Sequence, residues 1–121
     1  MLIHKTENKR KAFRYHPLPS NSLTVNFLGK NLPLIDISAG GVSFKNQGFI
    51  KENRDLITLV LEDSELKPNH VLSIAIRIIH IDAENICHCL FENPLNDQKE
   101  AIHHFLLVKQ KKEIRQKQQA K

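Results

Sequence analysis

Two arginines, Arg10 and Arg14, stand four residues apart in the sequence KRKAFRYHP. That spacing puts both side chains on one side of the segment, whether it is helical or extended. Guanidinium groups bind phosphate oxygens bidentately, stack flat on bases and pair with the O6/N7 edge of guanine. The pair could therefore bind a phosphorylated guanine nucleotide. Taken alone, it fits a solvated basic arm at least as well.

A second group of polar residues, Asp36, Ser38 and Gly41, lies in the sequence DISAGG. If this segment is a strand, Ile35 and Ile37 point to the core, and Asp36 and Ser38 point together to the other face. A carboxylate can accept hydrogen bonds from guanine N1–H and N2–H, and a hydroxyl can donate or accept nearby. Gly41 lets the backbone approach a ligand closely or adopt a positive φ. An ordinary turn between two strands is the alternative.

A third group, His80 with Cys87, His88 and Cys89, raises the question of a zinc site. Structural zinc sites usually space their cysteines as C-x₂₋₄-C and need four ligands, so we favour a strand with Cys87, Cys89 and Phe91 on one face. Cysteines one residue apart on a strand strain a disulfide, which predicts reduced thiols. Nothing else in the sequence suggests a nucleophile with its base or paired catalytic carboxylates, so we expect a protein that is not an enzyme.

Six short segments in the middle of the chain are apolar or alternate with a period of two, as half-buried strands do. They are residues 23–27, 34–38, 42–44, 56–61, 71–81 and 86–91. Pro33, Gly40 with Gly41, and the Lys67-Pro68-Asn69 sequence are among the expected breaks between them. Strands without intervening helices predict an antiparallel barrel or sandwich.

After Asn93-Pro94 the apolar residues recur at helical spacing up to Val108. Asp97 and Glu100 fit a D-x-x-E variant of the capping box, which predicts a helix that begins near Asp97. The apolar stripe then stops. We expect residues 109–121 to be either a solvated helical extension or disordered.

The net charge of +5 is concentrated at the two ends of the chain. Residues 1–16 carry five Lys/Arg and one acid, residues 109–121 carry six and one, and residues 17–108 carry seven Lys/Arg against eleven Asp/Glu. Nucleic-acid-binding domains usually spread basic groups over a folded face and interleave aromatics for stacking. With six Phe, one Tyr and no Trp, this chain has few. Nucleic acid is therefore the less favoured partner.

The 121 residues fit one domain with a single core. The apolar start, Met1 to Ile3, is too short for a signal peptide, and no run approaches the length of a membrane span. We expect a cytoplasmic protein without membrane insertion.

The two polar groups follow one another in the sequence, and Asp36 lies 22 positions after Arg14. In this the sequence resembles the PilZ domain family, whose signature is R-x-x-x-R in an N-terminal loop followed by D/N-x-S-x-x-G at a strand end. The resemblance covers roughly residues 9–108, and the family binds the bacterial second messenger cyclic di-GMP. It implies that Arg10 and Arg14 contact guanine edges and phosphates, and that the second group lines the opposite side. Lys9, where many members carry a further Arg, is an additional candidate contact that could change ligand stoichiometry.

The resemblance implies an all-β fold, a six-stranded antiparallel PilZ-like β-barrel with a C-terminal α-helix. Residues 1–16 would form the basic arm with the ligand loop, 17–108 the barrel and closing helix, and 109–121 a basic tail. The expected function is a cyclic di-GMP receptor or adaptor that changes conformation on binding and signals to an effector protein, with no metal or other cofactor. The basic tail is also compatible with self-association into homo-oligomers. The alternative function is a nucleic-acid-binding or scaffold protein that uses the basic termini.

Overall fold

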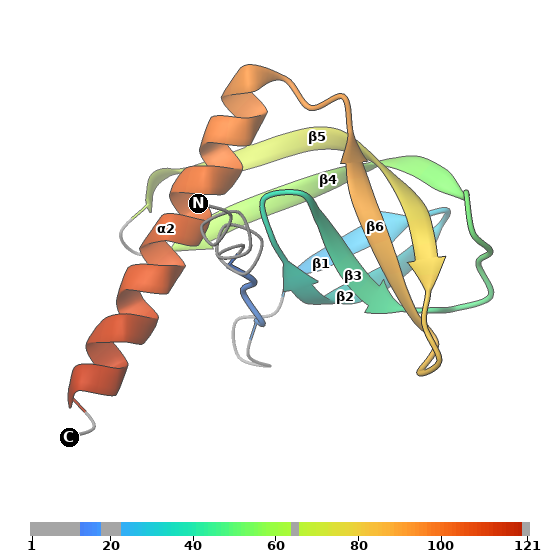
Figure 1. Ribbon diagram of the computed structural model, residues 1–121. Coiled ribbons are helices and arrows are strands. Elements are labelled where there is room, and N and C mark those ends of the chain that lie inside the picture. The colour runs from blue at the N-terminus through green and yellow to red at the C-terminus, as the bar shows by residue number, and fades with distance from the viewer. Residues whose placement is uncertain (1–12, 18–22, 64–65, 120–121) are drawn as a thin grey trace, which may run out of the picture.

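The computed structural model describes residues 13–17, 23–63 and 66–119 (Figure 1). Its six strands are β1 (Thr24–Phe27), β2 (Lys30–Ile37), β3 (Gly41–Lys45), β4 (Arg54–Asp63), β5 (Leu66–Ile81) and β6 (Ile86–Glu92), followed by helix α2 (Asn96–Gln119). All neighbouring strands are antiparallel, in the order β1-β2-β3-β6-β5-β4. The sheet curls until β1 lies against β4, which makes the nearly closed barrel that was predicted.

The seam between β1 and β4 is closed by a hydrogen bond instead of a ladder. The backbone N–H of Leu28, in the turn after β1, donates to the Asp55 carboxylate at the start of β4 over 2.8 Å. Leu28 has a positive φ of 50°, and the next residue, Gly29, has one of 86°. Such a left-handed pair matches the twist of a tight hairpin, so the turn brings β2 directly back along β1.

In most strands, the apolar residues of the period-two alternation face the barrel interior, as predicted. The four predicted inward residues of β5 are all buried: Leu72, Ile74, Ile76 and Ile78. Phe27, Phe44 and Phe49 pack ring against ring, with centroids 5.0 to 6.0 Å apart. Burial of this apolar surface is the main stabilising contribution to the fold.

Two expected breaks lie inside strands. Pro33 is part of β2, opposite Thr24 of β1. Proline is tolerated there because the pairing of β2 with β3 begins only at Leu34, so no hydrogen bond to β3 is lost. Residues 67–69 belong to β5, which begins at Leu66 and pairs with Asp63 at the end of β4.

The alternation fails at Ile35, which we expected in the core. A β-bulge between Leu34 and Asp36 inserts one extra residue into β2 opposite β3. Ile35 is that extra residue, and its side chain is 38% exposed, whereas Asp36 and Ile37 are both buried. The predicted separation of two inward isoleucines from an outward aspartate is therefore wrong at Ile35, because a bulge shifts the register by one residue.

Helix α2 begins at Asn96, one residue before the predicted start. Its first turn is capped by Gln98, whose Oε1 accepts the backbone N–H of Leu95 over 2.9 Å. Gln98 also donates to the carbonyl of Ser73 on β5, over 2.7 Å. We expected Asp97 and Glu100 to form this cap. The observed cap ties the start of the helix to the barrel as well.

Helix α2 packs against β4 and β5 and continues without interruption to Gln119. Its buried residues are Ala101, Ile102, Phe105, Leu106 and Val108. Residues 109–119 are therefore the helical extension that we considered, and the expected boundary after Val108 falls inside the helix. Within the described residues, no helix has both the length and the apolar content to cross a membrane.

Two lysines of this extension bind the barrel. Lys109 Nζ lies 2.6 Å from Asp63 Oδ2, and Lys112 Nζ lies 2.7 Å from Asp63 Oδ1. The Asp63 side chain is only 2% exposed. We call these three residues the Asp63 junction. It fixes the middle of α2 to the end of β4.

Candidate functional site

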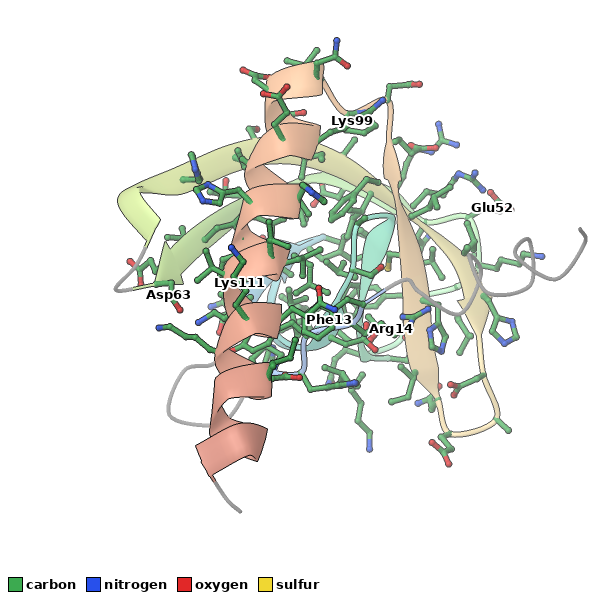
Figure 2. The ribbon with its side chains drawn as sticks, turned by 60° about the vertical axis from the view of Figure 1, so that its left-hand side comes forward. Phe13, Arg14, Glu52, Asp63, Lys99 and Lys111 are labelled. Atoms are coloured by element: carbon green, nitrogen blue, oxygen red, sulfur yellow. The ribbon has the colours of Figure 1, made fainter. Side chains whose placement is uncertain are left out.

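The N-terminal segment is attached to the barrel through Tyr15. Its backbone N–H and C=O form a bridge with Ile37 at the end of β2, with N···O distances of 2.9 and 3.0 Å. The Tyr15 ring is buried and meets Phe105 of α2 edge to face, with centroids 5.8 Å apart. Figure 2 shows the neighbouring Phe13 and Arg14 on the side of the barrel between α2 and β6. Arg14 is thereby held beside the end of β2.

Arg14 and Asp36 form an ion pair with an Nη1···Oδ1 distance of 3.4 Å. The Asp36 side chain is 10% exposed and that of Arg14 is 55% exposed, so the carboxylate lies beneath the guanidinium. Among the described residues, Arg14 makes no other hydrogen bond through its side chain. Asp36 therefore holds one nitrogen of the guanidinium, and the rest of the group stays open to a ligand.

Ser38 begins the tight turn between β2 and β3, and Gly41 is the first residue of β3. The Ser38 N–H donates to the Gly41 carbonyl, and the Gly40 carbonyl accepts the N–H of Phe91 on β6, both over 2.9 Å. A Cβ at Gly41 would lie 1.8 Å from the carbonyl oxygen of Cys89. We predicted that Gly41 permits approach to a ligand or a positive φ. The close approach observed is to the neighbouring strand.

These residues surround an open hollow of about 180 Å³ on the outside of the barrel. Of the predicted residues, Arg14, Ser38 and Gly41 line it, while Asp36 lies beneath Arg14. Arg10 and Lys9 lie outside the described residues. Six residues absent from the predicted set also line the hollow: Gly40, Val42, Ile79, His88, Cys89 and Leu90.

From the sequence alone, we considered His88 only as a metal ligand. It lines the hollow because β6 pairs with β3, a contact between segments far apart in the sequence. His88 Nε2 lies 2.9 Å from Asp82 Oδ2, and its ring stacks on His80 with centroids 5.7 Å apart. The hydrogen bond with His88, followed by one from the Ile86 N–H, lowers the pKa of the Asp82 carboxyl. Asp82 is thus a carboxylate at neutral pH.

The two cysteines face the barrel interior together with Phe91, as predicted. Burial raises the pKa of Cys87 to about 11 and that of Cys89 to about 12. Both thiols are therefore protonated at neutral pH, and a protonated thiol is a poor nucleophile and metal ligand. In the part of the chain that the structure describes, no group of three or more His, Cys, Asp or Glu residues is arranged to hold a metal ion.

Comparison with known proteins identifies the domain. The family model described as PilZ domain matches residues 8–107. Among solved structures, the PilZ domain with c-di-GMP of YcgR from Escherichia coli superposes with a TM-score of 0.62 at 16% identity, covering 92% of this chain and 98% of that one. The Bacillus subtilis inhibitor of motility (MotI/DgrA) gives 0.58 at 17% identity, covering 84% of this chain and 51% of that one. No curated protein sequence matches.

Proposed function

This chain belongs to the PilZ domain family, and from that premise we propose that it is a receptor for cyclic di-GMP that signals to an effector protein. The observation that carries the proposal is the convergence of Arg14 with Ser38 and Gly41 on one hollow, although the arginine is more than twenty residues away in the sequence. The YcgR domain of the same fold is a complex with this nucleotide.

The chemistry of the hollow suits a phosphorylated guanine nucleotide. The open part of the Arg14 guanidinium can bind phosphate oxygens or the O6/N7 edge of guanine. Ser38 can donate or accept a hydrogen bond beside it. We assign Asp36 a different task from the one expected: because it lies beneath Arg14, it orients the guanidinium instead of facing the base.

The size of the hollow indicates that it takes only part of the ligand. Its volume of about 180 Å³ is below the roughly 300–1,000 Å³ typical of small-molecule pockets. The rest of a cyclic dinucleotide would need contacts outside the hollow. We therefore propose Arg10 and Lys9 as the further contacts, as the family signature implies.

We propose that Tyr15 carries the signal to α2. It follows Arg14 in the chain, and its ring contacts Phe105. The Lys109 ammonium lies 5.1 Å from the centroid of the Tyr15 ring and 5.4 Å from that of Phe105, while binding Asp63. A ligand that moves Arg14 would therefore alter the packing of Tyr15 on α2, and an effector could read the change at the helix.

Residues 5–16 carry five Lys/Arg that repel one another, which predicts that this segment becomes ordered when the anionic nucleotide binds. Residues 13–16 include the Tyr15 bridge, whereas residues 5–12 lie outside the described residues. Hydrogen exchange with and without cyclic di-GMP tests the proposal. We expect added protection before Phe13 and a smaller change around Phe105. Equal protection in both states would remove the basis for the signalling route.

The ligand itself is tested by isothermal titration calorimetry with cyclic di-GMP, using GTP and cyclic GMP as controls. We expect binding of the cyclic dinucleotide alone. Failure to bind it, or equal binding of all three, would overturn the proposed function. The nucleic-acid alternative has less support than the sequence suggested, because two of the six basic residues in 109–121 are paired with Asp63.

A further inference from the structure

A row of polar side chains crosses four neighbouring strands beside the hollow. Asp36 of β2 pairs with Ser43 of β3, Ser43 pairs with His88 of β6, and His88 pairs with His80 of β5. Directly opposed residues of antiparallel strands share a face of the sheet. The row lies on the outer face, because the residues before and after Ser43 and His88 are buried in the core. Arg14 contacts its first member.

The middle of this row contains an unsatisfied polar atom. Ser43 is 1% exposed, and its hydroxyl oxygen has no hydrogen-bond partner among the described residues. Buried polar groups are nearly always paired, and an unpaired one in a native fold calls for an explanation. Among the described residues, the row thus contains an unpaired buried hydroxyl between Asp36 and His88.

His88 lines the hollow and is held in place by Asp82. Its Nε2 contacts Asp82 Oδ2, while Asp82 Oδ1 accepts the backbone N–H groups of Glu84 and Ile86 over 2.9 and 3.1 Å. The turn between β5 and β6 thus fixes the carboxylate, and the carboxylate fixes the ring. Nδ1 remains as the nitrogen that can bind something else, which is the usual consequence of such an orienting contact.

We propose that His88 is a phosphate-binding residue of the hollow, which contacts the nucleotide as an imidazolium and makes its affinity increase as the pH falls. The proposal rests on the proposed function. The other groups around the ring are Asp82, His80 stacked on it, the uncharged Ser43 on β3 and Arg14, which also lines the hollow. A phosphate would place a second anion beside the ring, and two anions favour the charged form of histidine.

At a pH where the His88 ring of the free protein is neutral, binding as an imidazolium requires that the ring takes up one proton. Histidine changes its charge between about pH 5 and 8, so this is the range in which the affinity should vary. Arg14 keeps its charge throughout this range and cannot cause the variation. Asp82 stays ionised there, because His88 and the turn lower its pKa.

The test is the affinity for cyclic di-GMP between pH 5.5 and 8.5, measured by calorimetry on the full chain. We expect wild-type affinity to fall about tenfold from the acid to the alkaline end, the size of one charge-assisted contact. His88→Gln should bind weakly and without pH dependence, and His88→Arg should bind at every pH with the affinity of the acid form. His103→Gln, an exposed histidine on α2, is the matched control and should behave as wild type.

The outcomes separate the two proposals. A wild-type affinity that does not vary with pH, or an unchanged slope in a His88→Gln protein with the circular dichroism spectrum of wild type, would overturn the role of His88 and leave the proposed function in place. If His88→Gln misfolds, His88→Arg provides the test. An affinity that still varies with pH in that variant also excludes the proposed role of His88. Absence of cyclic di-GMP binding at every pH would overturn both.

Discussion

Asp36 and Asp63 each form ion pairs with basic side chains from another segment of the chain. The two arrangements differ in distance, in the number of partners and in exposure. Asp36 makes one contact of 3.4 Å with an arginine whose side chain is 55% exposed. Asp63 is 2% exposed and makes contacts of 2.6 and 2.7 Å with two lysines of α2. The first pair is long and single, and its arginine is open to solvent. The second is short, double and closed.

The difference separates a binding element from a structural one. An exposed ion pair contributes little to stability, because water and salt screen it, and its cation remains free to bind an anion. A buried carboxylate with two cations contributes chiefly because it cannot be left alone without a large cost. We therefore expect changes at the Asp63 junction to alter stability, and changes at Arg14 to alter ligand affinity.

The largest effect should follow from truncation of the chain after Val108, which removes both lysines and leaves the Asp63 carboxylate buried without them. We expect a loss of about 3–5 kcal/mol in the free energy of unfolding, measured by urea denaturation. Truncation after Glu113 keeps both lysines and should cost less than about 1 kcal/mol. Equal stability of the two truncated proteins would show that the junction has no structural role.

A smaller loss of stability should follow from Asp63→Asn, because the lysines keep an oxygen partner and can turn partly toward water. We expect about 1.5–3 kcal/mol, the range for hydrogen bonds to charged groups. Asp36→Asn, its counterpart at the open pair, should cost less than about 1 kcal/mol. Urea denaturation of both variants, side by side, measures the comparison directly, and a reversed order would refute it.

Arg14→Ala should leave stability nearly unchanged and reduce the affinity for cyclic di-GMP about ten- to a hundredfold, corresponding to 1–3 kcal/mol for a lost bidentate contact. The matched control is Arg54→Ala, an arginine that is 64% exposed and also paired with a carboxylate. It should bind as wild type. Calorimetry decides the matter, and equal affinity in the two variants would argue against the hollow as the site.

The smallest effect is expected for Ile35→Ala. The alternation of the sequence predicts a core truncation that costs about 2–5 kcal/mol, whereas a bulge residue on the surface should change stability by less than about 0.5 kcal/mol. Thermal or urea denaturation distinguishes these values easily. A large loss would mean that β2 has no bulge and that Ile35 faces the core, as the sequence first indicated.

The strands could be predicted from local patterns, because every second residue of a half-buried strand faces the core and must be apolar. The alternating apolar residues of β5 and the change to helical spacing after Pro94 can be read without any knowledge of the fold. The bulge at Ile35 could not be read in this way. The sequence Ile35-Asp36-Ile37 has a perfect period of two, and only the pairing with β3 and the contact with Arg14 reveal that the aspartate is buried.

The candidate site was predictable in part for the same reason. Asp36, Ser38 and Gly41 are neighbours in the sequence, so a local motif contains them. His88 joins them only through the pairing of β3 with β6, and Lys109 meets Tyr15 only because α2 returns across the barrel. Contacts of that kind depend on the topology, for which a single sequence carries no local signal.

The hydrogen bond from Leu28 to Asp55 has a consequence for how this protein behaves at high concentration. Both edges of the sheet, β1 and β4, meet at that seam, and β1 is only four residues long. Unpaired strand edges are templates for pairing with a second chain, and proteins avoid this by shortening or covering them. Opening of this seam would expose the ten-residue edge of β4 and invite aggregation or strand exchange between copies.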